Sequence, residues 1–155
     1  MLTTWQEALQ NRRQCRGKVV FTNGVFDILH RGHLDILKAA SMCGDMLIVG
    51  VNSDSSARSL NKAPDRPVNS EQDRAELVAA LKPVDIVVIF EQSTPEELVK
   101  FLQPDVIVKG GDYSPDDVAG GGFVRSIGGE IVIIPLTPGK STTELIRKIR
   151  KSDCD

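Results

Sequence analysis

Five short apolar runs, rich in valine and isoleucine, recur along the chain at intervals long enough to hold a helix between each pair. They cover residues 19–22, 46–51, 86–90, 106–108 and 131–134. The runs do not alternate between apolar and polar residues, which is typical of parallel strands covered by helices on both faces. The pattern therefore predicts an α/β fold, with a five-stranded parallel sheet and helices on both faces.

Capping residues mark where several of the intervening helices begin. An N-terminal helix is expected over about residues 4–15, because Thr4 and Glu7 have the spacing of a capping box. Three further starts are expected at Ser70, at Thr94 followed by Pro95, and at Ser141. Pro83 should end the helix that Ser70 begins, while residues 114–129 resist assignment because three consecutive glycines interrupt them.

Composition narrows the class of protein. The 155 residues fit a single domain over 1–155, with its core over 18–150, and a net charge of −2 argues against nucleic acid or an anionic membrane as a partner. Three cysteines without metal-ligand spacing are typical of free thiols in a reducing compartment. The N-terminus lacks the apolar core of a signal peptide, and no apolar run is long enough to span a bilayer. We therefore expect a cytoplasmic protein that binds small molecules.

Four segments should meet at one edge of the predicted sheet, because ligands of such sheets bind beyond the carboxyl ends of the strands. They are residues 23–33, 52–69, 109–113 and 137–143, and they hold nearly every unusual residue of the chain.

Both histidines of the chain lie in the first of these segments, at the start of a helical pattern that runs through Leu34, Leu37 and later apolar residues. A helix N-terminus favours phosphate through its unpaired N–H groups and its dipole, and Gly32 between the histidines would admit a phosphate close to the backbone. An ordinary hydrogen-bonded pair of histidines is the alternative. The shared position of His30 and His33 beside a glycine, after the first strand, favours the phosphate site.

The segment Phe-Thr-Asn-Gly-Val-Phe-Asp-Ile-Leu-His-Arg-Gly-His resembles a family signature. Its His-x-Gly-His motif is similar to that of the cytidylyltransferase-like nucleotidyltransferases, which have a single Rossmann-like domain. The longer string resembles the adenylyltransferase half of bifunctional heptose 7-phosphate kinase/heptose 1-phosphate adenylyltransferases. The resemblance extends from Lys18 to Ile149. Val25 stands where that group often has cysteine. The kinase half has no counterpart in these 155 residues, so we expect kinase activity to come from another protein.

This resemblance implies AMP transfer from ATP to D-glycero-β-D-manno-heptose 1-phosphate, giving ADP-heptose and pyrophosphate for lipopolysaccharide or surface-polysaccharide precursors. Such an in-line displacement at phosphorus depends mainly on positioning and charge neutralisation. Mg²⁺ is expected with the triphosphate, and the sequence shows no metal-binding motif. The resemblance gives catalytic roles to His30, His33 and Lys62. It implies nucleotide binding by Thr22, Asn23, Gly24, Phe26, Asp27, Gly32, Arg66, Lys109, Gly110, Gly111, Asp112, Ser141, Thr142 and Thr143.

Simpler explanations stay open for several of these residues. Basic residues such as Lys62 and Arg58 also serve solubility, and Asp27 is either a turn aspartate or one that orients a histidine or a metal-bound water. Arg74 either reaches the phosphates or pairs with Glu71 one helical turn away. The Gly110–Gly111 pair also suits a plain turn, and the hydroxyls of residues 141–143 also suit an ordinary helix cap.

Two other functions stay open as well. The first is a cytidylyltransferase acting on a small phosphate such as glycerol 3-phosphate. Leu136 argues against it, since related glycerol phosphate enzymes carry arginine there. The second is a non-catalytic nucleotide-binding module on the same fold. A homodimer is the default expectation for the assembly.

Overall fold

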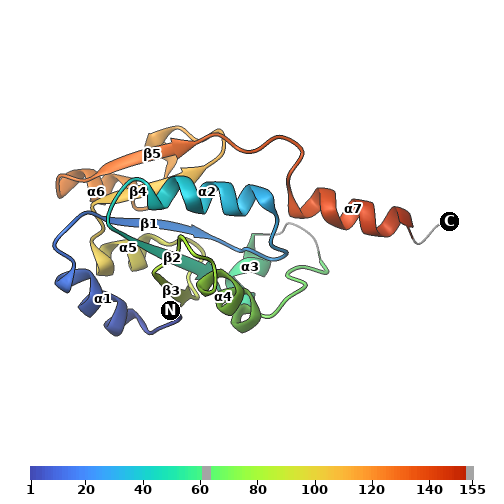
Figure 1. Cartoon of the computed structure of the whole chain (residues 1–155), viewed down its shortest axis with the longest axis horizontal. Coiled ribbons are helices and arrows are strands. Elements are labelled where there is room, and N and C mark those ends of the chain that lie inside the picture. Colours follow the sequence, from blue (N-terminus) through green and yellow to red (C-terminus); the bar gives the residue numbers. More distant parts are fainter. Residues whose placement is uncertain (61–63, 153–155) are drawn as a thin grey trace.

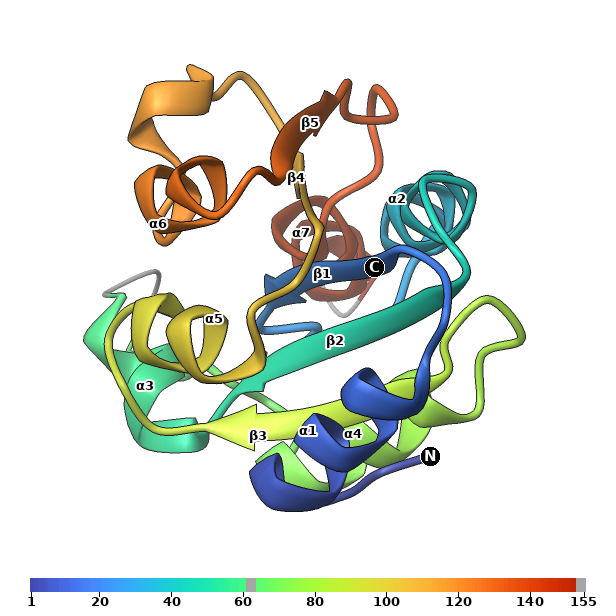
Figure 2. The same cartoon turned by 90° about the vertical axis from the view of Figure 1, so that its left-hand side faces the viewer.

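A five-stranded parallel sheet forms the centre of the molecule, in the order β3-β2-β1-β4-β5 (Figures 1 and 2). The computed structural model describes residues 1–60 and 64–152. All five apolar runs become strands, which confirms the predicted Rossmann-like sheet. They are β1 (Val19–Gly24), β2 (Met46–Asn52), β3 (Ile86–Phe90), β4 (Val106–Gly110) and β5 (Glu130–Ile134).

Helices cover both faces of the sheet, as the pattern predicts. One apolar cluster packs α1 (Trp5–Gln14), α5 (Glu96–Leu102) and α6 (Gly121–Ser126) against one face. A second cluster packs α2 (Arg31–Ser41) and α4 (Glu71–Ala79) against the other. The remaining helices are α3 (Asp54–Ser59), the 3₁₀ turn η1 (Pro115–Asp117) and α7 (Thr142–Ser152), which projects from the carboxyl edge of the sheet (Figure 1). None of the helices in the described ranges has the length and apolar character that crossing a bilayer requires.

The helix starts agree with the capping residues in most cases. The capping box of Thr4 and Glu7 is present, and the Ser70 hydroxyl accepts the N–H of Asp73. The prediction for Thr94 is wrong, because the Pro95 carbonyl accepts the first helical hydrogen bond and α5 begins one residue later. Likewise α4 ends at Ala79, before Pro83 is reached.

The two neighbours of β1 pair with it to different extents. Every residue of β1 pairs in register with β2, from Val19↔Met46 to Gly24↔Val51. β4 is in register only at Val20↔Val106 and Phe21↔Ile107. β1 and β4 therefore separate towards their carboxyl ends, at the position where the winding of the sheet reverses. Parallel sheets of this type bind ligands at that position.

Candidate active site

A cleft of 410 Å³ opens where β1 and β4 separate. Most residues that the sequence predicts for the site line it. They are Thr22, Asn23, Gly24, Phe26, Asp27, His30, Gly32, His33, Arg66, Lys109, Gly110, Ser141, Thr142 and Thr143. The structure thus brings together residues from segments 23–33, 109–113 and 137–143. From segment 52–69 it adds Arg66, which lies near the end of that segment.

Three predicted residues are placed elsewhere or lie outside the described ranges. Gly111 has φ 125° and donates its N–H to Ile134 O at 2.9 Å, so it joins the ends of β4 and β5. Asp112 is exposed and does not line the cleft. Lys62 lies outside the described residues.

The two histidine rings stack at the entrance to α2. Their centroids lie 3.8 Å apart with an interplanar angle of 23°. His30 is the N-cap of the helix, and its Nδ1 accepts the backbone N–H of Gly32 at 3.1 Å. Burial lowers the pKa of His30 below its ordinary value of 6.5. His30 is therefore a neutral imidazole near pH 7, with the proton on Nε2.

Gly32 has a packing role that the sequence did not reveal. Its N–H is donated to His30 Nδ1, so this amide already has a partner within the protein. A Cβ at this position would lie 3.0 Å from the His30 ring and 3.1 Å from Lys140 O. Glycine therefore lets the loop that precedes α7 approach the histidine pair.

Lys109 crosses the crevice from β4. Its Nζ donates to Asn23 Oδ1 at 3.1 Å and lies 5.6 Å from the centre of the Tyr113 ring. The contact joins the two strand ends across the gap where the backbones no longer pair. It places a positively charged side chain in the wall of the cleft.

Asp27 anchors a loop beside the cleft. Its side chain is fully buried and accepts hydrogen bonds from Arg66 Nε at 3.1 Å, Val68 N at 2.7 Å and Asn69 N at 3.1 Å. Its carboxylate thus holds residues 66–69 beside the first strand. Arg66, itself 13% exposed, lines the cleft through this ion pair.

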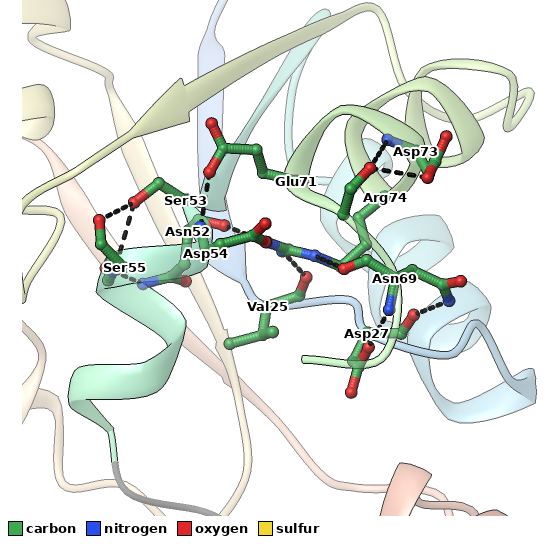
Figure 3. A network of polar contacts seen from close by, with 12 residues as sticks. Val25, Asp27, Asn52, Ser53, Asp54, Ser55, Asn69, Glu71, Asp73 and Arg74 are labelled. Carbon is green, nitrogen blue, oxygen red and sulfur yellow. Dashed lines mark hydrogen bonds and ion pairs between the residues drawn. The ribbon is translucent and has the colours of Figure 1, made fainter. Parts of the chain in front are cut away.

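Arg74 does not lie in the cleft. Its fully buried guanidinium donates to three backbone carbonyls, of Val25, Asn52 and Asn69, and to the carboxylate of Asp54 (Figure 3). Both predicted roles of Arg74 are therefore wrong. Its side chain turns inward to bind these acceptors, and Glu71 instead accepts the N–H of Asp54.

The start of α7 combines capping with cleft lining. Ser141 Oγ accepts the N–H of Glu144 at 3.1 Å, the geometry of an N-cap. Thr142 is buried and Thr143 exposed, and both line the cleft. The loop before this helix is tied to α2 because Thr137 Oγ1 donates to Asp35 Oδ2 at 2.8 Å.

Several further residues line the cleft that were not predicted individually as site residues. They are Val25, Ile36, Tyr113, Leu136, Thr137 and Lys140. Ile36 follows His33 by one helical turn, so helical spacing alone would have placed it on the same face. Tyr113 is the last residue of the predicted segment 109–113. Thr137 and Lys140 lie within the predicted segment 137–143, although neither was predicted individually.

A second cavity, of 350 Å³, adjoins the first on the other side of the β1 end. The two cavities share the wall formed by Asn23, Gly24, Val25, Lys109 and Tyr113. The second is also lined by Asn52, Ser93, Thr94 and Asp117, among others. The strand end thus separates two spaces large enough for small molecules.

The chain is similar to several known proteins. The family described as "Cytidylyltransferase-like" matches residues 21–148. The bifunctional protein HldE of Methylobacillus flagellatus is 49% identical over 141 residues, which are 91% of this chain and 29% of that protein. HldE of Syntrophotalea carbinolica is 53% identical over 135 residues, 86% of this chain and 27% of that protein. The chain thus spans less than a third of these relatives.

Solved structures show the same fold. The lipopolysaccharide core biosynthesis protein of Thermoplasma volcanium has a TM-score of 0.65 and 30% identity, over 78% of this chain and 97% of that one. The pantoate-β-alanine ligase of Francisella tularensis has a TM-score of 0.59 at 15% identity, over 92% and 68%. The second likeness concerns the fold alone.

Proposed function

The chain belongs to the cytidylyltransferase-like family, and from this premise we propose that it transfers AMP from ATP to D-glycero-β-D-manno-heptose 1-phosphate. The products are ADP-heptose and pyrophosphate, the nucleotide sugar being a precursor for lipopolysaccharide or surface polysaccharide. The HldE relatives support the heptose assignment by their similarity over most of this chain. In the reaction, a phosphate oxygen of the sugar forms a bond to the α-phosphorus of ATP, and the bond from that phosphorus to the β-phosphate oxygen breaks.

The observation that carries the proposal is the stacked histidine pair in the cleft between β1 and β4. His30 keeps a donor at Nε2, because its Nδ1 is occupied by the Gly32 amide. A neutral imidazole N–H that is held in place donates a hydrogen bond to the phosphate oxygens on which charge develops. It stabilises that charge without giving up its own proton. Lys109 and Arg66 add positive charge on the same cleft.

The two cavities suit the two substrates. We assign the nucleotide to the larger cleft, where Ile36, Tyr113 and Leu136 give apolar surface beside Gly110 for a base. The acceptor sugar fits the second cavity, because Asn52, Ser93 and Thr94 offer amide and hydroxyl groups to its hydroxyls. The shared wall at Asn23 and Lys109 is then the place where the two phosphates meet.

Mg²⁺ would neutralise part of the charge of the triphosphate. The described part of the chain groups no three His, Cys, Asp or Glu side chains that could hold a metal ion by themselves. We expect the ion to enter together with ATP.

The test is release of pyrophosphate by the purified protein with ATP, Mg²⁺ and heptose 1-phosphate. Release that needs all three components supports the proposal, and no release above background removes the heptose assignment. CTP with glycerol 3-phosphate is run in parallel, because turnover with that pair alone would identify a cytidylyltransferase. His33→Ala should lower the rate about a hundredfold or more, whereas a non-catalytic module would show no rate to lose.

A further inference from the structure

Phe26 adopts a backbone conformation that few non-glycine residues adopt. Its φ is 51°, in the left-handed region, although its side chain is large and only 5% exposed. The ring meets His33 edge-on, with centroids 5.2 Å apart and an interplanar angle of 61°. It also covers Gly24, where a Cβ would lie 3.1 Å from the ring. The strained turn thus supplies one wall of the His33 imidazole.

Hydrogen bonds fasten the chain on both sides of this turn. On the preceding side, the carbonyl of Val25 accepts from Arg74 Nη1 at 2.5 Å. On the following side, the carbonyl of Asp27 accepts from Asn69 Nδ2 at 2.6 Å, and its carboxylate accepts the N–H groups of Val68 and Asn69. A strained residue persists only where its surroundings fix it in this way.

Arg74 connects the two sides. Its Nε donates to Asn69 O at 3.1 Å (Figure 3). The same guanidinium therefore binds Val25 directly and binds Asn69, whose side chain in turn binds Asp27. Its Nη2 donates to Asn52 O and Asp54 Oδ1, both at 2.8 Å, which attaches the group to the end of β2. The arginine is fully buried and does not line the cleft, so its effect on a reaction there must pass through these contacts.

We infer that Arg74, Asn69 and Asp27 form a clamp that keeps Phe26 in its left-handed conformation and thereby sets the orientation of the His33 ring. Arg74 is in this view a positioning residue of the nucleotidyl transfer, and that part of the inference rests on the proposed function. A purely structural arginine would affect folding stability and leave the surroundings of His33 unchanged.

The test compares Arg74→Lys with Asn69→Ala. Lysine keeps the buried charge but cannot reach three separate carbonyls in the fixed geometry of a guanidinium. Asn69→Ala leaves Arg74 in place and removes only the Nδ2 bond to the Asp27 carbonyl, so it tests the clamp if Arg74→Lys does not fold. Arg125→Lys is the matched control, since Arg125 is a partly exposed arginine on α6 paired with Asp116.

Two readouts are measured on folded protein. Proton NMR of the imidazoles is simple because the chain has two histidines, and His33→Ala assigns them. The clamp predicts that Arg74→Lys and Asn69→Ala move the His33 ring signals and their titration midpoint in the absence of substrate. It also predicts that kcat falls about tenfold or more while KM for ATP changes less than about threefold, because misorientation acts on the transition state.

Unchanged His33 signals in a folded clamp variant would overturn the inference, even if its melting temperature fell. So would a wild-type kcat in a variant whose signals moved, or an equal change in Arg125→Lys. If the wild-type protein released no pyrophosphate, the proposed function would fail. The NMR comparison would still decide whether the clamp orients His33.

Discussion

Replacing Gly32 by alanine tests whether the packing around the histidine pair controls catalysis. The added methyl group would lie 3.0 Å from both Cε1 and Nδ1 of His30 and 3.1 Å from Lys140 O. The His30 ring has little room to retreat, because the His33 ring stacks on it at 3.8 Å. The ring must tilt or the loop before α7 must move, and either change disturbs the bond from Gly32 N to His30 Nδ1.

The expected magnitudes separate stability from activity. Alanine in a helix is favoured over glycine by about 0.5 to 1 kcal/mol, whereas forcing a methyl into a filled space costs about 1 to 3 kcal/mol. The net destabilisation should be about 1 kcal/mol, which lowers the melting temperature by about 2 to 4 °C in a chain of this size. A misdirected donor should cost more, since losing one entirely lowers kcat about a hundredfold to a thousandfold. We expect a fall in kcat of about tenfold to a hundredfold.

Gly122→Ala is the matched control. Gly122 is the second residue of α6, as Gly32 is of α2, and its added methyl would meet no atom within 4 Å. This variant should gain about 0.5 to 1 kcal/mol in the free energy of unfolding and keep its kcat. Pyrophosphate release and thermal melting are measured on both variants. A Gly32→Ala protein with wild-type kcat would show that the close approach of Lys140 to His30 is irrelevant to turnover.

Three further predictions concern titration and charge. Burial lowers the pKa of His30, so the unfolded chain binds a proton at this imidazole more readily than the folded protein does. The contribution of His30 to the free energy of unfolding is therefore present above about pH 6.5, and it is lost as pH falls through the lower pKa of the folded state. His30→Asn keeps an N-cap acceptor and should reduce the change of the free energy of unfolding with pH, measured by urea titrations at several pH values. An unchanged pH dependence would count against a lowered pKa of His30 in the folded state. Arg66→Ala should raise KM for ATP about tenfold and lower stability by about 1 to 3 kcal/mol, because the buried carboxylate of Asp27 loses its charged partner; steady-state kinetics and melting measure both, and an unchanged KM would remove Arg66 from the substrate site. Asp65→Ala breaks the exposed pair with Arg150 and should change stability by less than about 1 kcal/mol in urea unfolding, so a larger loss would mean that the pair matters more than its exposure suggests.

The fold could be predicted because its determinants are local in sequence. Each strand contains a continuous apolar run, and most helix starts carry their own capping residue, as Thr4 and Ser70 show. Residues 114–129 could not be assigned, because Gly120 takes φ 80° and separates η1 from α6. Such a choice depends on the tertiary structure around the glycines.

The site was predicted less completely than the fold. The rule for strand ends placed the histidines and Lys109 at the correct edge, since carboxyl ends of parallel strands share one edge. It also suggested Asp112, which follows the strand closely yet is exposed beyond the cleft. Sequence proximity to a strand end fixes the edge but not the direction of each side chain.

Arg74 shows why the direction of a side chain depends on distant segments. Its nearest candidate partner in sequence was Glu71, but its acceptors come from the ends of β1 and β2 and from the residues before α4. A buried arginine is stable only when its donors are satisfied, and an unsatisfied buried carbonyl costs about 1 to 3 kcal/mol. The three carbonyls and the guanidinium therefore satisfy one another's hydrogen bonds. Each group would be buried without a partner if the others were absent. The sequence suggested that the positive charge of Arg74 would bind phosphates, but this charge instead joins the segments around the cleft. Arg66 and Lys109 are basic side chains that line the cleft itself.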